Sequence, residues 1–234
     1  KIYILFTLCI TFFTAQTYAQ KGFHIGANAS AVNSYLVDDS LYGDVSYKPT
    51  FTLGPVIGFA AGNNFTNQFG LEVEVNYARL GQGYEYIDSI NMPKTVTNSG
   101  KITLDYIQVP VLLKFTGGDY KTRFSAMFGP QLGFLSSAWN RKGNSGALPA
   151  KQDFNKMDIG MLLTFGGDIS LTNDLYLNLG LRFYYGFKEV NKVPYVVAKE
   201  ENVNPPKDNL LNAYGGLNVG LHYLFRNNEN PKNK

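Results

Sequence analysis

The sequence predicts an all-β protein, an eight-stranded antiparallel up-and-down transmembrane β-barrel. Three observations predict it: eight runs alternate between apolar and polar or glycine residues, the connections between the runs alternate in length, and an apolar export segment opens the chain. The stretch LYLNLGLRFYYGF at 175–187 shows the alternation, because every odd position in it is apolar. Side chains alternate across a strand, so this run has one apolar face and one polar, glycine-rich face.

Eight predicted strands follow one another along the chain. They cover 23–30, 51–60, 69–78, 101–115, 123–134, 157–170, 175–187 and 217–225. Short connections with turn residues lie at 63–68, 116–120 and 172–174. Long polar connections lie at 32–50, 88–100, 138–155 and 189–209. This alternation is typical of an outer-membrane barrel, in which long loops face outside and short turns face the periplasm.

One run, KITLDYIQVPVLLKF at 101–115, changes the phase of its apolar positions. Its first apolar residues are at even positions, such as Tyr106, and its later ones are at odd positions, such as Val109. One extra residue near Ile107 would restore a single apolar face, so the sequence predicts a β-bulge there. Pro110 is expected on the inward face beside the bulge, where a missing N–H costs least.

The N-terminus is predicted to be a signal peptide over residues 1–19. The apolar run 2–13 is followed by the small residues Thr17 and Ala19, so cleavage is expected after Ala19. An uncleaved membrane anchor is the alternative, and the shortness of the run argues against it. The barrel is expected over 20–225 and a disordered periplasmic tail over 226–234.

The apolar faces could point inward, as in a soluble lipocalin-like barrel, or outward into lipid. Rows of about ten residues suit a tilted span of the bilayer, and the export segment supplies the route, so we expect the outward direction. Seven charged residues then face the lumen: Glu72, Glu74, Lys114, Arg123, Asp158, Asp168 and Arg182. Eight strands leave an interior that side chains can fill, and buried opposite charges must pair. A closed, salt-bridged lumen is therefore predicted in preference to a continuous pore.

The final strand carries a predicted membrane-insertion signal. Asn218, Gly220, Tyr223 and Phe225 follow a polar-x-Gly-x-x-aromatic-x-aromatic pattern in NVGLHYLF. An exposed strand that ends in aromatic residues can pair with the edge of the barrel-insertion machinery. An ordinary amphipathic strand that ends in aromatic residues is the alternative.

Three phrases resemble a known family. LDYIQVPVLLKF at 104–115, FSAMFGPQLGFL at 124–135 and LYLNLGLRFYYGF at 175–187 are similar to the PorT-like outer-membrane β-barrel family, and the resemblance extends over about 21–225. It implies an eight-stranded barrel in the outer membrane of a Gram-negative bacterium. The founding member is tied to a protein-secretion system, most relatives have no assigned role, and the resemblance brings no catalytic motif with it.

The two histidines, His24 and His222, are both predicted on the lumen face near the periplasmic rim, because the first and last strands of a closed barrel pair antiparallel. A pH-sensitive or metal-binding pair is one interpretation. Two ligands without a third make a poor metal site, so we expect two hydrogen-bonded lumen residues, with no metal and no cofactor.

An enzyme is not expected from this sequence. A membrane enzyme needs a base beside a nucleophile at the outer rim, whereas both histidines are predicted at the other end and no GxSxG motif occurs. A carboxylate protease built on Asp38, Asp39 and Glu85 is the remaining enzymatic alternative.

We therefore expect a non-enzymatic outer-membrane protein that presents its extracellular loops within an envelope or protein-secretion assembly. A small passive or ligand-specific channel is the alternative. The expected partners are outer-membrane lipid, the barrel-insertion machinery and other envelope proteins. A net charge of +3 is too small to indicate a nucleic-acid partner.

Overall fold

The computed structural model describes residues 21–37, 47–87, 96–119, 121–143, 145–192 and 209–226. The predicted signal peptide at 1–19 and residues 227–234 of the predicted tail lie outside the described residues. Within the described ranges, no helix is long and apolar enough to cross a membrane.

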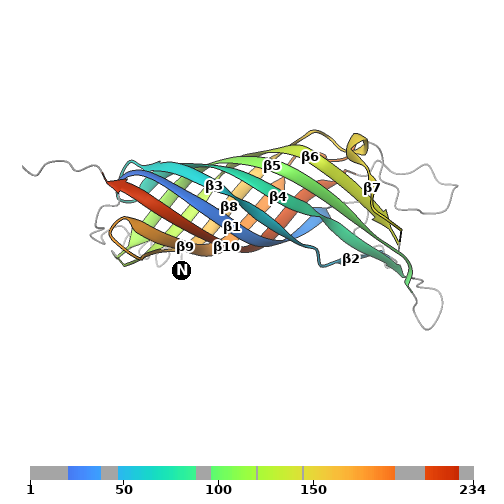
Figure 1. The fold of residues 1–234 in the computed structure, drawn as a ribbon, viewed down its shortest axis with the longest axis horizontal. Helices are drawn as coiled ribbons and strands as arrows, with labels where there is room; N and C mark the ends of the chain where they lie inside the picture. Colours follow the sequence, from blue (N-terminus) through green and yellow to red (C-terminus); the bar gives the residue numbers. More distant parts are fainter. Residues whose placement is uncertain are drawn as a thin grey trace, which may run out of the picture.

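Eight long antiparallel strands close into a ring, which confirms the predicted fold class (Figure 1). The ring consists of β1 (Gly22–Val37), β3 (Leu53–Asn64), β4 (Phe69–Ile87), β5 (Val96–Gly118), β6 (Thr122–Lys142), β8 (Met157–Ser170), β9 (Leu175–Gly186) and β10 (Leu211–Arg226). Each strand pairs with its neighbour in the chain order, and β10 pairs with β1 to close the ring. Two short strands, β2 (Tyr47–Thr50) and β7 (Leu148–Pro149), pair with β4 and β6, and a 3-10 turn, η3, covers Lys151–Asp153.

The register around the ring sets the tilt of the strands. A path from Leu53 through the paired residues Asn33, Gly215, Phe183, Leu163, Phe128, Leu113 and Leu71 returns to β3 at Asn63, ten residues further along. Eight strands with this stagger tilt by roughly 40° from the barrel axis. The interior of such a barrel is only wide enough for side chains to fill.

The outer wall of the ring is apolar. On β8 the outward row runs from Met157 to Ile169, and at about 3.3 Å per residue and this tilt it covers roughly 30 Å, which suits the apolar band of an outer-membrane barrel. Aromatic rings meet at one rim, where Phe23 and Phe225 have centroids 5.8 Å apart. We call this rim, which carries the three short connections and both ends of the ring's chain, the turn end, and the opposite rim the loop end. The turn end lies on the left in Figure 1.

The pairing of β5 with β6 shifts register between Asp105 and Tyr106, close to the predicted bulge, but the prediction of an extra residue on β5 itself is wrong. The alternation of β5 stays in phase throughout, since Tyr106, Gln108 and Pro110 are all buried on the lumen side. The only irregularity in the pairing of β5 with β6 lies on the other strand, where Ser136 is left over between two consecutive pairs. The apolar positions change face because the strand passes from lipid into water: beyond the bilayer the apolar residues belong on the inner side.

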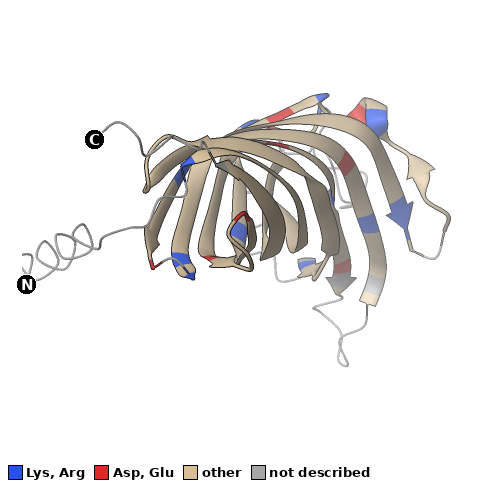
Figure 2. Cartoon of the chain, turned by 60° about the vertical axis from the view of Figure 1, so that its left-hand side comes forward, with Lys and Arg blue, Asp and Glu red and all other residues tan. Residues whose placement is uncertain are grey.

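The strands β4, β5 and β6 run on beyond the ring at the loop end. The expected long connections at 88–100 and 138–155 are therefore partly strand, because β4 continues to Ile87, β5 begins at Val96 and β6 continues to Lys142. With β2 and β7 at their edges they form a surface that we call the projecting sheet: β2, β7, and residues 79–87, 96–105 and 137–142. Figure 2 shows charged residues along these projecting strands.

An outward-facing polar cluster marks the boundary between the apolar band and the projecting sheet. The guanidinium of Arg79 donates to Asp105 Oδ1 through Nε at 2.7 Å, and the Ser137 hydroxyl donates to Asp105 Oδ2 at 2.7 Å. The Tyr77 hydroxyl completes the cluster at 2.9 Å from Asp105 Oδ1. A carboxylate held by three donors on the outer wall belongs at the bilayer surface, which agrees with the width of the apolar band.

Candidate functional site

The centre of the lumen is crossed by an ion pair between Arg182 on β9 and Glu74 on β4. Arg182 Nη2 pairs with Glu74 Oε2, and the two residues are 0% and 2% exposed. Asn76 Nδ2 donates to the same carboxylate oxygen at 2.7 Å, and Arg182 Nη1 donates to Asn218 Oδ1 at 3.4 Å. The amides of Asn76 and Asn218 thus supply part of the hydrogen bonding that the buried charges require.

A second charged layer lies nearer the turn end. Lys114 Nζ on β5 is 3.0 Å from Asp168 Oδ2 on β8, and Asn178 Nδ2 donates to Asp168 Oδ1 at 2.6 Å. The ammonium also lies 4.9 Å from the ring centroid of Tyr176 and donates to its hydroxyl at 3.4 Å. The lysine is therefore held by one carboxylate and one aromatic ring.

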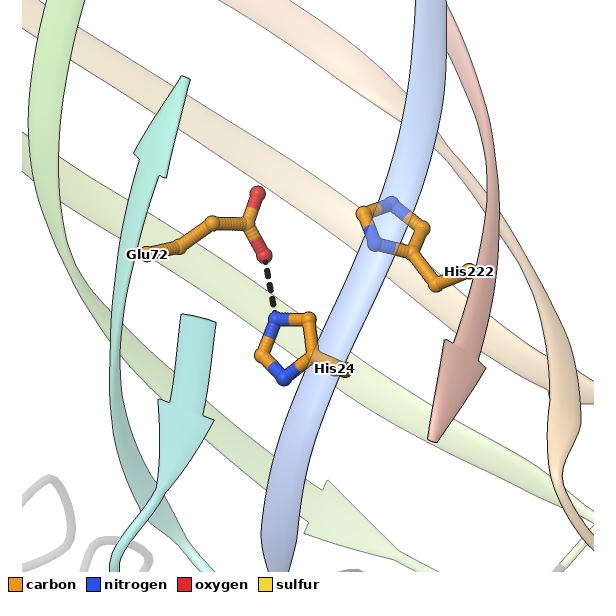
Figure 3. A group of neighbouring side chains, drawn as sticks. All are labelled: His24, Glu72 and His222. Carbon is orange, nitrogen blue, oxygen red and sulfur yellow. Dashed lines mark hydrogen bonds and ion pairs between the residues drawn. The ribbon is translucent and has the colours of Figure 1, made fainter. Parts of the chain in front are cut away.

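Three further groups meet in this layer: His24 on β1, Glu72 on β4 and His222 on β10 (Figure 3). His24 Nε2 is 2.9 Å from Glu72 Oε2. The two imidazole centroids are 5.8 Å apart, and the His222 ring stacks on Tyr176 with centroids 4.9 Å apart and planes 8° apart. All three residues are buried.

Glycines make room for the two imidazoles against the barrel wall. A Cβ on Gly26 would lie 2.5 Å from His222 Nδ1, and one on Gly62 would lie 2.6 Å from His24 Nε2. A Cβ on Gly220 would lie 2.8 Å from His222 Nε2. Since real Cβ atoms do not approach other atoms so closely, these positions require glycine as long as the rings keep their places.

Two of the seven charged residues that the sequence placed in the lumen stand apart from these pairs. Arg123 donates to the Asn67 carbonyl and, at 3.0 Å, to Thr116 Oγ1, which holds the connection between β3 and β4 at the turn end. Asp158 accepts a hydrogen bond from Asn212 Nδ2 at 2.8 Å near the loop end. All seven residues are buried on the lumen side, yet they form separate groups at different depths.

The loop end of the lumen is filled by apolar side chains. They belong to one buried cluster that includes Leu80, Leu104, Tyr106, Phe154, Val190 and Leu210. Backbone bonds hold its outer members together, because Val190 N donates to Leu210 O at 2.9 Å and Asn155 N donates to Val190 O at 2.7 Å. We call these six residues the apolar plug.

The four residues of the predicted insertion signal lie on both faces of β10. Asn218 and Gly220 face the lumen, whereas Tyr223 and Phe225 face outward at the turn end. Asn218 also accepts a hydrogen bond from Ser30 Oγ at 2.7 Å, so it takes part in the lumen network as well. The role of these residues in insertion stays a prediction.

Sequence reasoning placed both histidines inward and close together but missed the group that joins them. Glu72 is two strands away from His24 in the ring, with β3 between them. Alternation tells which face a residue takes, but only the register around the ring tells which residues share a depth. The signal for the glycine cradle was present, since Gly26, Gly62 and Gly220 all fall on the lumen face of their strands.

Comparisons with known proteins agree with this architecture. A family model of the outer membrane protein beta-barrel domain matches residues 14–191. A search among curated proteins found no match.

Solved structures resemble the chain at low sequence identity. Neisserial surface protein A is 17% identical, with 87% of this chain and 97% of that chain covered and a TM-score of 0.49. Outer membrane protein OprG from Pseudomonas aeruginosa is 13% identical, with 88% and 97% covered and a TM-score of 0.44. The outer membrane protease OmpT from Escherichia coli is 13% identical, with 91% and 99% covered and a TM-score of 0.44. The match of the family model to most of the chain shows that the protein belongs to the outer membrane protein beta-barrel domain family, in the outer membrane of Gram-negative bacteria.

Proposed function

We propose that the protein is a closed, non-enzymatic barrel that anchors the projecting sheet and its loops at the cell surface for a partner in the envelope. The observation that carries the proposal is the filled lumen. The pair of Arg182 and Glu74 occupies its middle, the layer around Lys114 lies toward the turn end, and the apolar plug occupies the loop end. A barrel filled at three depths is suited to anchoring and poorly suited to conduction.

The projecting sheet is the part of the described chain best placed to meet a partner. In an outer-membrane barrel the short turns face the periplasm, so the loop end would face outside. Exposed apolar side chains gather there without lipid to cover them: Leu148 on β7 is 69% exposed, and Val96 and Trp139 are also exposed. Apolar side chains in such a place favour contact with another protein.

The absence of enzymatic activity is part of the proposal. Catalysis at the cell surface needs a nucleophile beside a base at the outer rim. The chain has two histidines, and both lie in the lumen layer at the turn end. The alternative of a carboxylate protease needs Asp38 and Asp39 together with Glu85. Asp38 and Asp39 lie outside the described residues.

The proposal also includes the family assignment, the export and the membrane insertion that the sequence predicts. We propose that the chain is a PorT-like barrel with a role in an envelope or protein-secretion assembly. Its export would end with cleavage after Ala19, and its last strand, with Tyr223 and Phe225, would be recognised by the insertion machinery.

A small channel is the second candidate, and one observation favours it. Buried lumen atoms such as Asn28 Nδ2, Gln108 Nε2 and Gln131 Nε2 have no hydrogen-bond partner among the described residues. Buried polar atoms of this kind are commonly satisfied by water, so the lumen would hold water between its charged layers and the plug.

Planar-bilayer recording of the purified protein separates the two candidates. The closed barrel should show no steady conductance, whereas the channel should conduct in the wild-type form. In parallel, a photo-reactive amino acid at Leu148 should give one discrete protein adduct in living cells, and one at Leu171, exposed at the turn end, should not give the same adduct. Steady conductance together with no adduct at Leu148 would reject the scaffold in favour of the channel.

A further inference from the structure

We propose that His24, Glu72 and His222 form a binding site for one divalent transition-metal ion of the zinc type, inside the lumen near the turn end. Each residue offers one ligand atom, and these atoms all lie within 4.8 Å of one another. The site is independent of whether the barrel serves as a scaffold or as a channel.

The donor set fits such an ion. Two imidazole nitrogens and one carboxylate oxygen are the ligands that zinc takes in sites with three protein ligands, where the fourth position is left to water. With metal–ligand bonds of about 2.0–2.1 Å, tetrahedral ligand atoms lie roughly 3.3 Å apart. The contact of 2.9 Å between His24 Nε2 and Glu72 Oε2 is close to that value, and the ligand atom of His222 lies within 4.8 Å of the other two.

The orientation of His222 points to a ligand that would occupy the site. Figure 3 shows one nitrogen of its ring turned toward His24 and Glu72. Its Nδ1 is buried and has no hydrogen-bond partner in the described part of the chain. A buried nitrogen without a partner is unfavourable, and an ion bound between the three groups would satisfy it.

The barrel wall is shaped for this arrangement. Gly26 and Gly220 leave the space in which the His222 ring lies, and Gly62 leaves the space for the His24 ring. Stacking on Tyr176 fixes the plane of the His222 ring. The ligands therefore sit on three rigid strands with their rings oriented before an ion arrives, which lowers the cost of binding.

Of the two carboxylates near the site, Asp168 is paired with a lysine, which leaves Glu72 to bind the ion. Lys114 is the nearby cation, and it is paired with Asp168 at 3.0 Å. In the described part of the chain the ion-pair contact of Glu72 is with His24, at 2.9 Å, and a bound ion would replace it. The bound ion would tie β1, β4 and β10 together across the seam where the first and last strands close the ring.

The test is metal binding by the folded protein, purified in detergent without a histidine tag and stripped with a chelator. Wild-type protein should bind about one zinc ion per chain, and cobalt in its place should give visible absorption typical of low coordination number. We expect zinc binding to weaken by more than roughly a hundredfold in each of the variants His24→Gln, Glu72→Gln and His222→Gln. Removal of a group that only hydrogen-bonds to a metal ligand costs less than this. Asp158→Asn makes the same type of change near the loop end, away from the three ligands, and should keep the stoichiometry.

Folding of each variant is checked by its faster migration in SDS without boiling. Zinc should also raise the temperature at which wild-type protein loses that mobility, and the chelator should lower it, a readout that needs no variant. The proposal is overturned if folded wild-type protein binds no zinc, or if the double variant His24→Gln and His222→Gln binds it as tightly as the wild type.

Discussion

Arg182 and Glu74 form an ion pair between two strands that face each other across the ring, although the residues stand 108 positions apart in the chain. Four steps separate β4 from β9 in either direction around the ring, so the pair spans the full diameter of the lumen. Both side chains are long, which lets them meet at the axis. The pair therefore connects opposite walls of the barrel and also blocks the middle of the lumen.

Removal of one member of this pair should destabilise the barrel more than removal of both. Glu74→Gln or Arg182→Met leaves a buried charge without its partner, which should cost about 3–5 kcal/mol. Replacement of both residues by methionine should recover much of that loss, because no charge is left buried. Urea unfolding in phospholipid vesicles, followed by mobility in SDS, measures all three variants. Equal stability of the single variants and the wild type would mean that water enters the lumen at this depth and screens the charges.

Arginine at a lipid-facing position should have a much larger effect than arginine on the projecting sheet. Leu163 is outward on β8 in the middle of the apolar band and 45% exposed, whereas Leu148 on β7 lies beyond that band. Leu163→Arg should destabilise the barrel in vesicles by about 2–4 kcal/mol, and Leu148→Arg by close to zero. The two variants carry the same change, so each is the control of the other. A soluble barrel would tolerate both, and that result would contradict the outward direction of the apolar face.

Gly26→Ala should disturb the lumen, whereas Gly117→Ala should not. The added Cβ at Gly26 would lie 2.5 Å from His222 Nδ1 and 2.8 Å from Leu221 O, and at Gly117 it would meet nothing within 4 Å. Forced movement of a packed ring should cost about 1–3 kcal/mol. Urea unfolding compares the two variants, and equal midpoints would show that the His222 ring can swing away freely.

The sequence was sufficient for the fold because lipid imposes one rule on every strand. Alternation with an apolar outward row recurs in all eight strands, as in Met157–Ser170, and it needs no knowledge of neighbours. The same rule failed above the bilayer. Ile102, Leu104 and Tyr106 were read as outward with a bulge after them, but they face inward, because water instead of lipid covers the projecting sheet.

The lumen site could be predicted only in part, for a geometric reason. Whether a residue faces the lumen follows from its odd or even position along the strand, and all seven predicted charged residues face the lumen. Pairing depends on the stagger of ten residues around the ring, which no local pattern encodes. Glu74 pairs with Arg182, as opposite charges in the lumen should. Glu72 instead pairs with His24, and Arg123 donates to the Asn67 carbonyl.

The aromatic end of β10 should promote insertion of the barrel into the outer membrane, in addition to its packing against β1. Phe225 and Phe23 lie on neighbouring strands with ring centroids 5.8 Å apart and tilted planes, and both face outward at the turn end. If only this contact were important, Phe225→Ser and Phe23→Ser would lower the amount of folded protein equally, since each removes one ring of the same pair. If the last strand is recognised through its terminal aromatic residues, Phe225→Ser should lower the amount of folded barrel in the outer membrane of cells far more than Phe23→Ser. Unboiled SDS gels of outer-membrane fractions measure that amount, and refolding of both variants in vesicles without the insertion machinery provides the control. Equal losses in cells would leave the insertion signal without support.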